Sequence, residues 1–115
     1  MTEIKEGDKL YVITRRDLDP GYQAVQSLHA MRQFIADHPD VDKNWFENSN
    51  YLALLSVKDE CELHALISRA LKRNFKVSAY KEEDVDFQVT AIAIEPAGSA
   101  LCKNFPLALK EFNGR

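Results

Sequence analysis

The chain has 115 residues, of which 45% are hydrophobic and 29% charged, and its formal net charge is −3. This composition excludes a disordered polypeptide and predicts one domain with a buried core, over residues 1–115. No run reaches the roughly 18 apolar residues of a membrane span, and the first residues lack the apolar stretch of a signal peptide. We therefore expect a cytoplasmic protein without membrane contact, with residues 1–8 flexible.

Chemistry based on metals, cofactors or thiols is not expected. The two cysteines, Cys61 and Cys102, are predicted to be reduced in a compartment without disulfide formation. Neither has a recognisable base partner, and no Cys/His spacing suits zinc. A glycine-rich phosphate loop and a Gly-x-Ser-x-Gly nucleophile elbow are absent from the sequence.

The first half of the chain predicts a strand followed by a long helix. Residues 10–14 form an apolar, β-branched run that is typical of a buried strand. Asp19-Pro20 predicts the helix start, because Asp can cap free N–H groups and Pro suits the first helical position. The helix should end near His38, before Pro39. Apolar residues at helical spacing predict its buried stripe, which consists of Ala24, Leu28, Met31 and Ile35.

Residues 40–48 predict a loop with at most one helical turn, in which Trp45 and Phe46 serve as packing anchors. The nearly continuous apolar run 51–57 predicts a strand covered on both faces. Asp59-x-x-Glu62 resembles a capping box with Asp as the cap, so a helix should follow. The predicted buried face of that helix consists of Leu63, Leu66, Ile67, Ala70 and Leu71.

Two further strands complete the predicted sheet, over residues 75–80 and 87–94, with the acidic loop 81–86 between them. Alternation along the last strand places Val89 with Ala91 on one face and Thr90 with Ile92 on the other. The tail predicts a short helical turn and an edge strand over 107–110. The expected fold is a small α/β domain, with a four-stranded mixed sheet, helices on both faces, and its first two strands parallel.

Charged residues follow the first two strands, in segments 14–18 and 56–60. The carboxyl ends of parallel strands meet at one edge of a sheet, where ligands of α/β proteins bind. These two loops therefore define a candidate site, although loops at strand ends are commonly polar for solvation alone.

Three stretches of sequence carry a resemblance to a known family. Arg16-Asp17-Leu18, followed by GYQAVQSLHA at 21–30, resembles the N-terminal signature of archaeal/eukaryotic-type peptidyl-tRNA hydrolases. SVKDExxL at 56–63 resembles the exit of the family's second strand, and TAIAIEPA at 90–97 its closing-strand motif. The resemblance covers residues 9–110 and agrees with the predicted order of elements.

The resemblance implies hydrolysis of the ester between a peptide and the 3′ end of tRNA. Asp59 matches the family's proposed catalytic aspartate, and Thr90 its strand threonine. Gln26 and His29 match the polar pair of the signature helix. Such a reaction needs an oriented water, a group that accepts its proton, and donors for the developing oxyanion. No cofactor is implied.

The resemblance also implies tRNA or peptidyl-tRNA as the partner, together with a homodimer. The residues expected to contact the substrate lie near the two strand ends and on the second helix; they are Arg15, Arg16, Asp17, Tyr22, Lys58, Arg69, Lys72 and Arg73. Cations among them suit phosphate groups. Arg69, Lys72 and Arg73 are equally explained by the helix dipole, which favours cations in the last turn.

The sequence departs from the family pattern at several positions. The family's lysine after the signature glycine is Tyr22, the basic loop before the last strand is the acidic segment 81–86, and a family glycine is Glu95. Each change disfavours phosphate binding. The alternative function is therefore a catalytically inactive relative that serves as a binding or assembly module. In that case Asp59 is an ordinary helix cap, Thr90 a structural strand residue and His29 a hydrogen-bonded helix residue.

Overall fold

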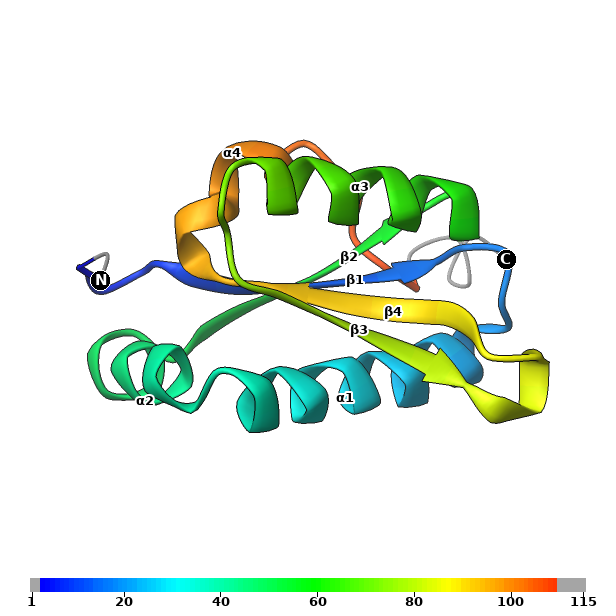
Figure 1. Ribbon diagram of the computed structural model, residues 1–115, viewed down its shortest axis with the longest axis horizontal. Helices are drawn as coiled ribbons and strands as arrows, with labels where there is room; N and C mark the ends of the chain where they lie inside the picture. Colours follow the sequence, from blue (N-terminus) through cyan, green and yellow to red (C-terminus); the bar gives the residue numbers. More distant parts are fainter. Residues whose placement is uncertain (1–2, 110–115) are drawn as a thin grey trace.

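The computed structural model describes residues 3–109 and places one sheet between two helical layers (Figure 1). The elements in chain order are β1 (Lys9–Arg15), α1 (Pro20–Asp37), α2 (Pro39–Asn48), β2 (Tyr51–Val57), α3 (Glu60–Lys72), β3 (Val77–Glu82), β4 (Gln88–Ile94) and α4 (Ser99–Cys102). Short 3-10 turns precede β4 and α4. Helices α1 and α2 cover one face of the sheet, and α3 and α4 cover the other.

The sheet has the strand order β2-β1-β4-β3. Strands β1 and β2 are parallel, whereas β4 is antiparallel to both β1 and β3. This confirms the predicted four-stranded mixed sheet with helices on both faces. Two apolar cores result, one against α3 that contains Ile13 and Leu66, and one against α1 that contains Val12 and Phe34.

The buried face of α1 differs from the predicted stripe. The residues that face the sheet are Gln23, Gln26, Ser27, Ala30 and Phe34. Leu28 is 62% exposed, and Ala24, Met31 and Ile35 are only partly buried. The prediction was wrong because it assigned apolar residues to the interior, whereas two glutamines occupy the interior and make hydrogen bonds there.

Residues 39–48 form the helix α2 rather than the predicted loop, because Pro39 begins a second helix as well as ending the first. Trp45 is buried and its Nε1–H donates to the Tyr51 carbonyl at 2.8 Å, which confirms it as a packing anchor. Phe46 is exposed, so the same expectation was wrong for Phe46.

Strand β4 contains a bulge that reorients one side chain. Tyr80 pairs with Ala91 and Lys81 pairs with Val89, so Thr90 has no partner on β3. Val89 consequently packs with Ile92 in the core against α3, and Thr90 turns toward α1. The predicted alternation was therefore wrong at Val89 and Thr90, since it assumed an uninterrupted strand.

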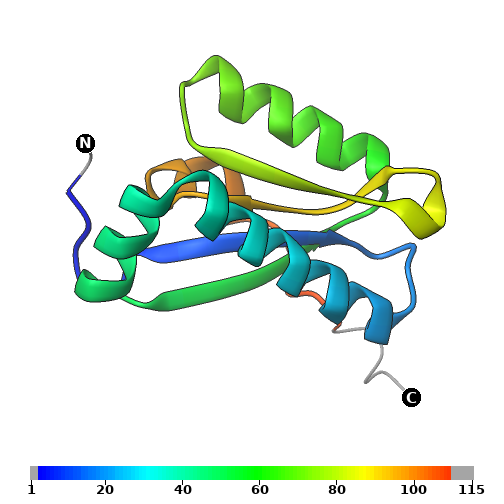
Figure 2. The same ribbon diagram turned by 60° about the horizontal axis from the view of Figure 1, so that its bottom comes forward.

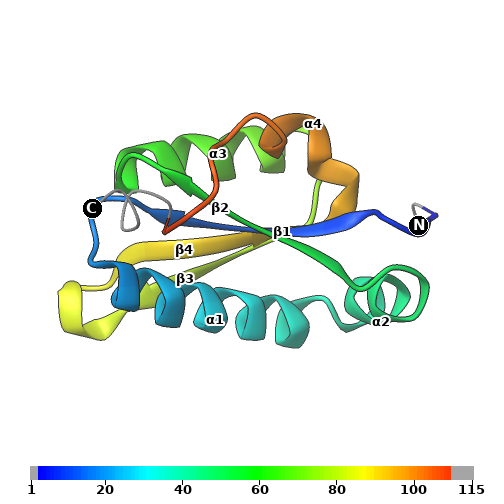
Figure 3. The same cartoon turned by 180° about the vertical axis from the view of Figure 1, so that it is seen from behind.

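Strand β2 lies at the edge of the sheet, and the prediction that it is covered on both faces was wrong for its first residues (Figure 3). Its first two residues are exposed and its last three are buried. On α3, Leu63, Leu66 and Ala70 are buried as predicted and Ile67 partly so, but Leu71 is 58% exposed. Strand β3 begins and ends two residues later than the range 75–80.

The ends of the described chain pack onto the domain. Ile4, within the segment expected to be flexible, is buried in the core against α1. The predicted helical turn of the tail is α4, and the predicted edge strand is a single antiparallel bridge between Leu55 and Leu107. Lys110 lies outside the described residues. No helix within residues 3–109 is long and apolar enough to cross a membrane.

Candidate active site

The charged strand ends gather at one edge of the sheet. The carboxyl ends of β1 and β2 meet there, followed by the first turns of α1 and α3. Because β4 is antiparallel to β1, its first residues and the turn that leads into it from β3 lie at the same edge (Figures 1 and 2). Three stretches of the chain that are distant in sequence therefore surround one site: the end of β1 with the start of α1, the end of β2 with the start of α3, and the turn from β3 into β4.

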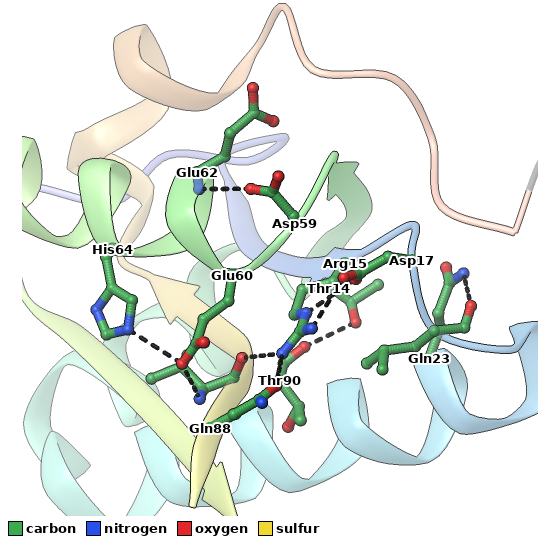
Figure 4. Close-up of polar contacts among 12 residues, drawn as sticks. Thr14, Arg15, Asp17, Gln23, Asp59, Glu60, Glu62, His64, Gln88 and Thr90 are labelled. Atoms are coloured by element: carbon green, nitrogen blue, oxygen red, sulfur yellow. Dashed lines mark hydrogen bonds and ion pairs between the residues drawn. The ribbon is translucent and has the colours of Figure 1, made fainter. Parts of the chain in front are cut away.

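Arg15 is the buried centre of the site (Figure 4). It is 7% exposed, and its Nε and Nη2 donate to the two carboxylate oxygens of Asp17, both at 2.9 Å. Its Nη1 donates to Gln88 Oε1 at 2.9 Å and to the Val89 carbonyl at 3.1 Å. Four of its five donor hydrogens are thus engaged within the protein. Arg15 fixes β1 against β4 and the first loop.

A series of buried hydrogen bonds connects β1, β4, α1 and β3 at the site. The Thr90 hydroxyl donates to Gln26 Oε1 at 2.5 Å, and Gln26 Nε2 donates to Glu82 Oε1 at 2.9 Å. The Thr14 hydroxyl donates to the Thr90 carbonyl at 3.0 Å. Gln26 is 1% exposed, and both threonines are fully buried. This series of hydrogen bonds links α1 to β3 and β4.

Two acidic residues at the start of α3 have different environments. Asp59 is the cap, and its Oδ1 accepts the Glu62 N–H at 3.1 Å, as the capping-box pattern predicts. Glu62 Oε1 in turn accepts the Lys58 N–H rather than that of Asp59. Glu60 Oε2 accepts the Val89 N–H at 2.9 Å and contacts His64 Nε2 at 3.2 Å. Glu60 therefore ties α3 to β4, whereas Asp59 keeps its second carboxylate oxygen available.

Hydrogen bonds stabilise the ionised form of three carboxylates at this edge. The Arg15 guanidinium lowers the pKa of Asp17, and the Val89 N–H lowers the pKa of Glu60. The Gln26 amide lowers the pKa of Glu82, with a further contribution from the Asp84 N–H. Two of these carboxylates, Asp17 and Glu60, act on the charge of Arg15, and Asp59 acts on it as well.

The first turn of α1 carries unpartnered polar groups. Asp19 makes no capping hydrogen bond with its side chain, contrary to the prediction, although the helix begins at Pro20 as expected. The Tyr22 hydroxyl is enclosed without a hydrogen-bond partner, as is Gln23 Oε1. Burial raises the pKa of Tyr22, and the nearby Glu82 and Asp84 charges raise it further.

The structure separates the predicted cations into two groups. Arg16 lies at the site, where its Nη1 donates to the Ser56 carbonyl at 3.2 Å, and Lys58 is exposed beside Asp59. The other three cations lie at the end of α3, where Arg69 and Lys72 are in the last turn and Arg73 is the C-cap, about 14 to 20 Å along the helix axis from its first residue. They therefore belong to the opposite edge of the sheet.

His29 lies on the exposed side of α1, where its ring stacks on Tyr80 of β3 at 4.4 Å between centroids. It is thus one turn beyond Gln26 and outside the series of buried hydrogen bonds. Sequence reasoning missed Glu60, Glu82 and Gln88 as parts of the site. The position of Glu60 after a helix cap was a usable signal, whereas the contacts of Glu82 and Gln88 depend on tertiary pairing.

Among residues 3–109, no group of three or more His, Cys, Asp or Glu side chains has an arrangement that could hold a metal ion. What the site offers instead is an α/β strand edge with a capped aspartate, a buried arginine and a threonine–glutamine pair.

Comparison with known proteins identifies the class. The family model for peptidyl-tRNA hydrolase PTH2 matches residues 9–112. The chain therefore belongs to the PTH2 peptidyl-tRNA hydrolase family. No curated protein matches it. Its fold is similar to that of a protein of unknown function from Agrobacterium tumefaciens strain C58, with a TM-score of 0.62 and 17% identity over 86% of this chain and 96% of that one.

Proposed function

We propose that this chain is a divergent peptidyl-tRNA hydrolase, which hydrolyses the ester between a peptide and the 3′ end of tRNA. The observation that carries the proposal is the position of Asp59. Its carboxylate makes one hydrogen bond, to the Glu62 N–H, and is partly exposed at the strand edge where Arg15 and Thr90 are buried. A carboxylate in that position can orient a water molecule and accept its proton.

The roles of the other groups in the reaction are assigned from their hydrogen bonds and exposure. The first N–H groups of α1, at Gly21 and Tyr22, are not used by the Asp19 side chain and are suited to hold the developing oxyanion. The Thr90 hydroxyl is committed to Gln26, so we assign both as positioning residues. His29 is exposed near them and is assigned to substrate contact.

Binding of tRNA is assigned to two separate groups of cations. Arg16 and Lys58 lie at the site and suit the phosphates nearest the ester. Arg69, Lys72 and Arg73 are exposed at the far end of α3, where they suit a more distant part of the same tRNA. Arg15 is excluded from phosphate contact in this proposal, because its side chain is buried and paired with Asp17.

A second candidate function is a binding module that has lost catalysis, and one observation favours it. Tyr22 replaces the family's lysine, and its hydroxyl is enclosed near the Glu82 and Asp84 carboxylates. A tyrosine cannot supply the lysine's charge at neutral pH. In this alternative the acidic edge repels phosphate, and the partner is a protein.

The test is release of peptide from an N-blocked aminoacyl-tRNA by the purified chain. Asp59→Asn is the decisive variant, because asparagine caps a helix as well as aspartate does but cannot accept the proton of water. Turnover in the wild type that is lost in Asp59→Asn supports the proposal. An absence of turnover in the folded wild type, with no tRNA binding at low salt, overturns it and supports the binding module.

A further inference from the structure

Two rings are stacked where α1 packs along β3 (Figure 1). The imidazole of His29 and the phenol ring of Tyr80 are 4.4 Å apart between centroids, with an angle of 9° between their planes. Tyr80 is partly buried and packs against the apolar core under α1, whereas His29 is exposed. Tyr80 therefore covers one face of the imidazole, and the exposure of His29 comes from its other face and its edge.

The backbone fixes both rings relative to the candidate site. Tyr80 pairs with Ala91 at the last position of β3 before the bulge that turns Thr90 toward α1. His29 lies one turn of α1 beyond Gln26, which accepts a hydrogen bond from Thr90. The contact that joins α1 to β4 at the site thus also sets the position of the stacked rings.

The stacked rings lie on the face of α1 that begins with Tyr22. Seven positions separate Tyr22 from His29, so their side chains leave the helix in nearly the same direction, about 10 Å apart along its axis. The first N–H groups of α1, which the proposed function assigns to the oxyanion of the ester, are at the Tyr22 end of this face. A nucleoside whose 3′ oxygen forms the ester can extend from there along α1 and bring its base to His29.

A nucleobase is the ligand that suits these rings. Unpaired bases at the end of an RNA bind proteins by stacking on aromatic side chains, and every base has a flat face for this contact. The Glu82 and Asp84 carboxylates lie near Tyr22 and act on its hydroxyl. Negative charge disfavours a phosphate group but does not repel an uncharged base. Stacking is therefore the interaction with RNA that this part of the surface can offer.

We propose that His29 and Tyr80 form a stacking platform for the terminal base of the tRNA 3′ end. His29 contacts the base, and Tyr80 is a positioning residue that supports the imidazole from below. The identity of the ligand rests on the proposed function. Binding of the base, however, does not require that the chain is catalytic, so the two can be tested separately.

The experiment measures binding of the RNA trinucleotide CCA, the 3′-terminal sequence of tRNA, by fluorescence anisotropy of a dye at its 5′ end. A second probe has the same backbone but lacks the terminal base. The wild type should bind the complete probe about 5- to 150-fold more tightly than the abasic probe. His29→Ala should bind both probes with the same, weak affinity. His29→Phe keeps a flat aromatic face and should preserve the difference.

The role of Tyr80 is tested by the same ratio of affinities, which a general loss of stability does not change. Tyr80→Leu should remove the difference between the probes, because leucine fills the core but offers no ring to the imidazole. Tyr80→Phe should retain it. The matched control is Phe46→Ala, which removes a 60% exposed ring from α2 and should discriminate between the probes like the wild type.

Equal affinity of the wild type for the two probes, or no detectable binding of either, overturns the proposal. A folded His29→Ala variant that keeps the difference also overturns it. Hydrolysis of N-blocked aminoacyl-tRNA distinguishes this failure from that of the proposed function. In an active enzyme His29→Ala should raise KM more than it lowers kcat, since the base is bound before and during the reaction. Discrimination that depends on His29 without any turnover would support the platform and overturn only the hydrolase.

Discussion

Gln26 and Thr90 are 64 positions apart in the sequence, and the Thr90 hydroxyl donates to Gln26 Oε1 in the interior of the domain. The contact exists because the bulge in β4 turns Thr90 toward α1 instead of toward α3. Since Gln26 Nε2 also donates to Glu82, one glutamine joins a helix to two strands at the site. A buried amide with both ends paired fixes the distance between α1 and the sheet.

Thr90→Val should destabilise the protein. Valine has the same shape but no hydroxyl, so Gln26 Oε1 loses its donor while it remains buried. An unsatisfied buried acceptor costs about 1–3 kcal/mol, and we expect the free energy of unfolding in urea to fall by that amount. Thr90→Ser keeps the donor and is the control. Equal losses in the two variants would show that the methyl group, and not the hydrogen bond, is responsible.

Gly98 and Gly21 should respond in opposite ways to replacement by alanine. A Cβ atom on Gly98 would lie 2.6 Å from Ile94 Cγ2 and 3.4 Å from Phe75 Cδ2, so Gly98→Ala should cost about 1–3 kcal/mol through overpacking. A Cβ on Gly21 meets nothing within 4 Å. Because Gly21 is in the first turn of α1, Gly21→Ala should stabilise by up to about 1 kcal/mol. Thermal unfolding of both variants measures the difference, and a Gly98→Ala variant as stable as the wild type would contradict the packing argument.

Tyr22→Lys should increase the rate of peptide release if the absence of a lysine at this position limits the reaction. The new ammonium group would be attracted by the Glu82 and Asp84 carboxylates, whose charges already raise the pKa of Tyr22. Those carboxylates would keep it protonated and hold it at the strand edge. The measurement is the rate of ester hydrolysis with N-blocked aminoacyl-tRNA.

Tyr22→Phe is the matched control, because it removes only a hydroxyl group that has no partner. It should leave hydrolysis unchanged and should not destabilise the fold, since no hydrogen bond is lost. If Tyr22→Lys and Tyr22→Phe have the same rate as the wild type, a missing lysine does not limit the reaction.

The sequence predicted the strands well because their apolar runs reflect burial directly. Residues 51–57 form β2 over the whole predicted range, and Asp59 caps α3 as the capping box indicates. The orientation of α1 could not be predicted in the same way. Its interior positions are held by Gln23 and Gln26, which are buried because strand and loop groups pair with them. Such partners are known only once the sheet is assembled.

In the candidate site, too, only the residues with a signal local in sequence could be predicted. Asp59 was identifiable from the helix start that follows a strand, since both signals are local in sequence. The role of Arg15 as a buried, paired group was not, because its partners include Gln88 and Val89 on the last strand. The bulge at Thr90 also leaves no trace in the alternation of residues, since the pattern of β4 is apolar on both sides.

The last prediction concerns the pH dependence of stability through Glu60. Its carboxylate accepts the Val89 N–H, and this lowers its pKa in the folded protein. His64 and Arg15 also favour the charged form. A carboxyl group whose pKa is lower in the folded state stabilises that state above the unfolded pKa of about 4.3, and the stabilisation disappears as pH falls through the folded pKa.

Glu60→Gln isolates this effect, because the glutamine oxygen can still accept the Val89 N–H but carries no charge. The wild type should be more stable than the variant near neutral pH. The difference in unfolding free energy should shrink as the pH is lowered from about 6 to about 3, through the range in which the carboxylate is protonated. Urea titrations of both proteins at several pH values measure it. A difference that stays constant over this range would mean that the charge of Glu60 does not stabilise the contact between α3 and β4.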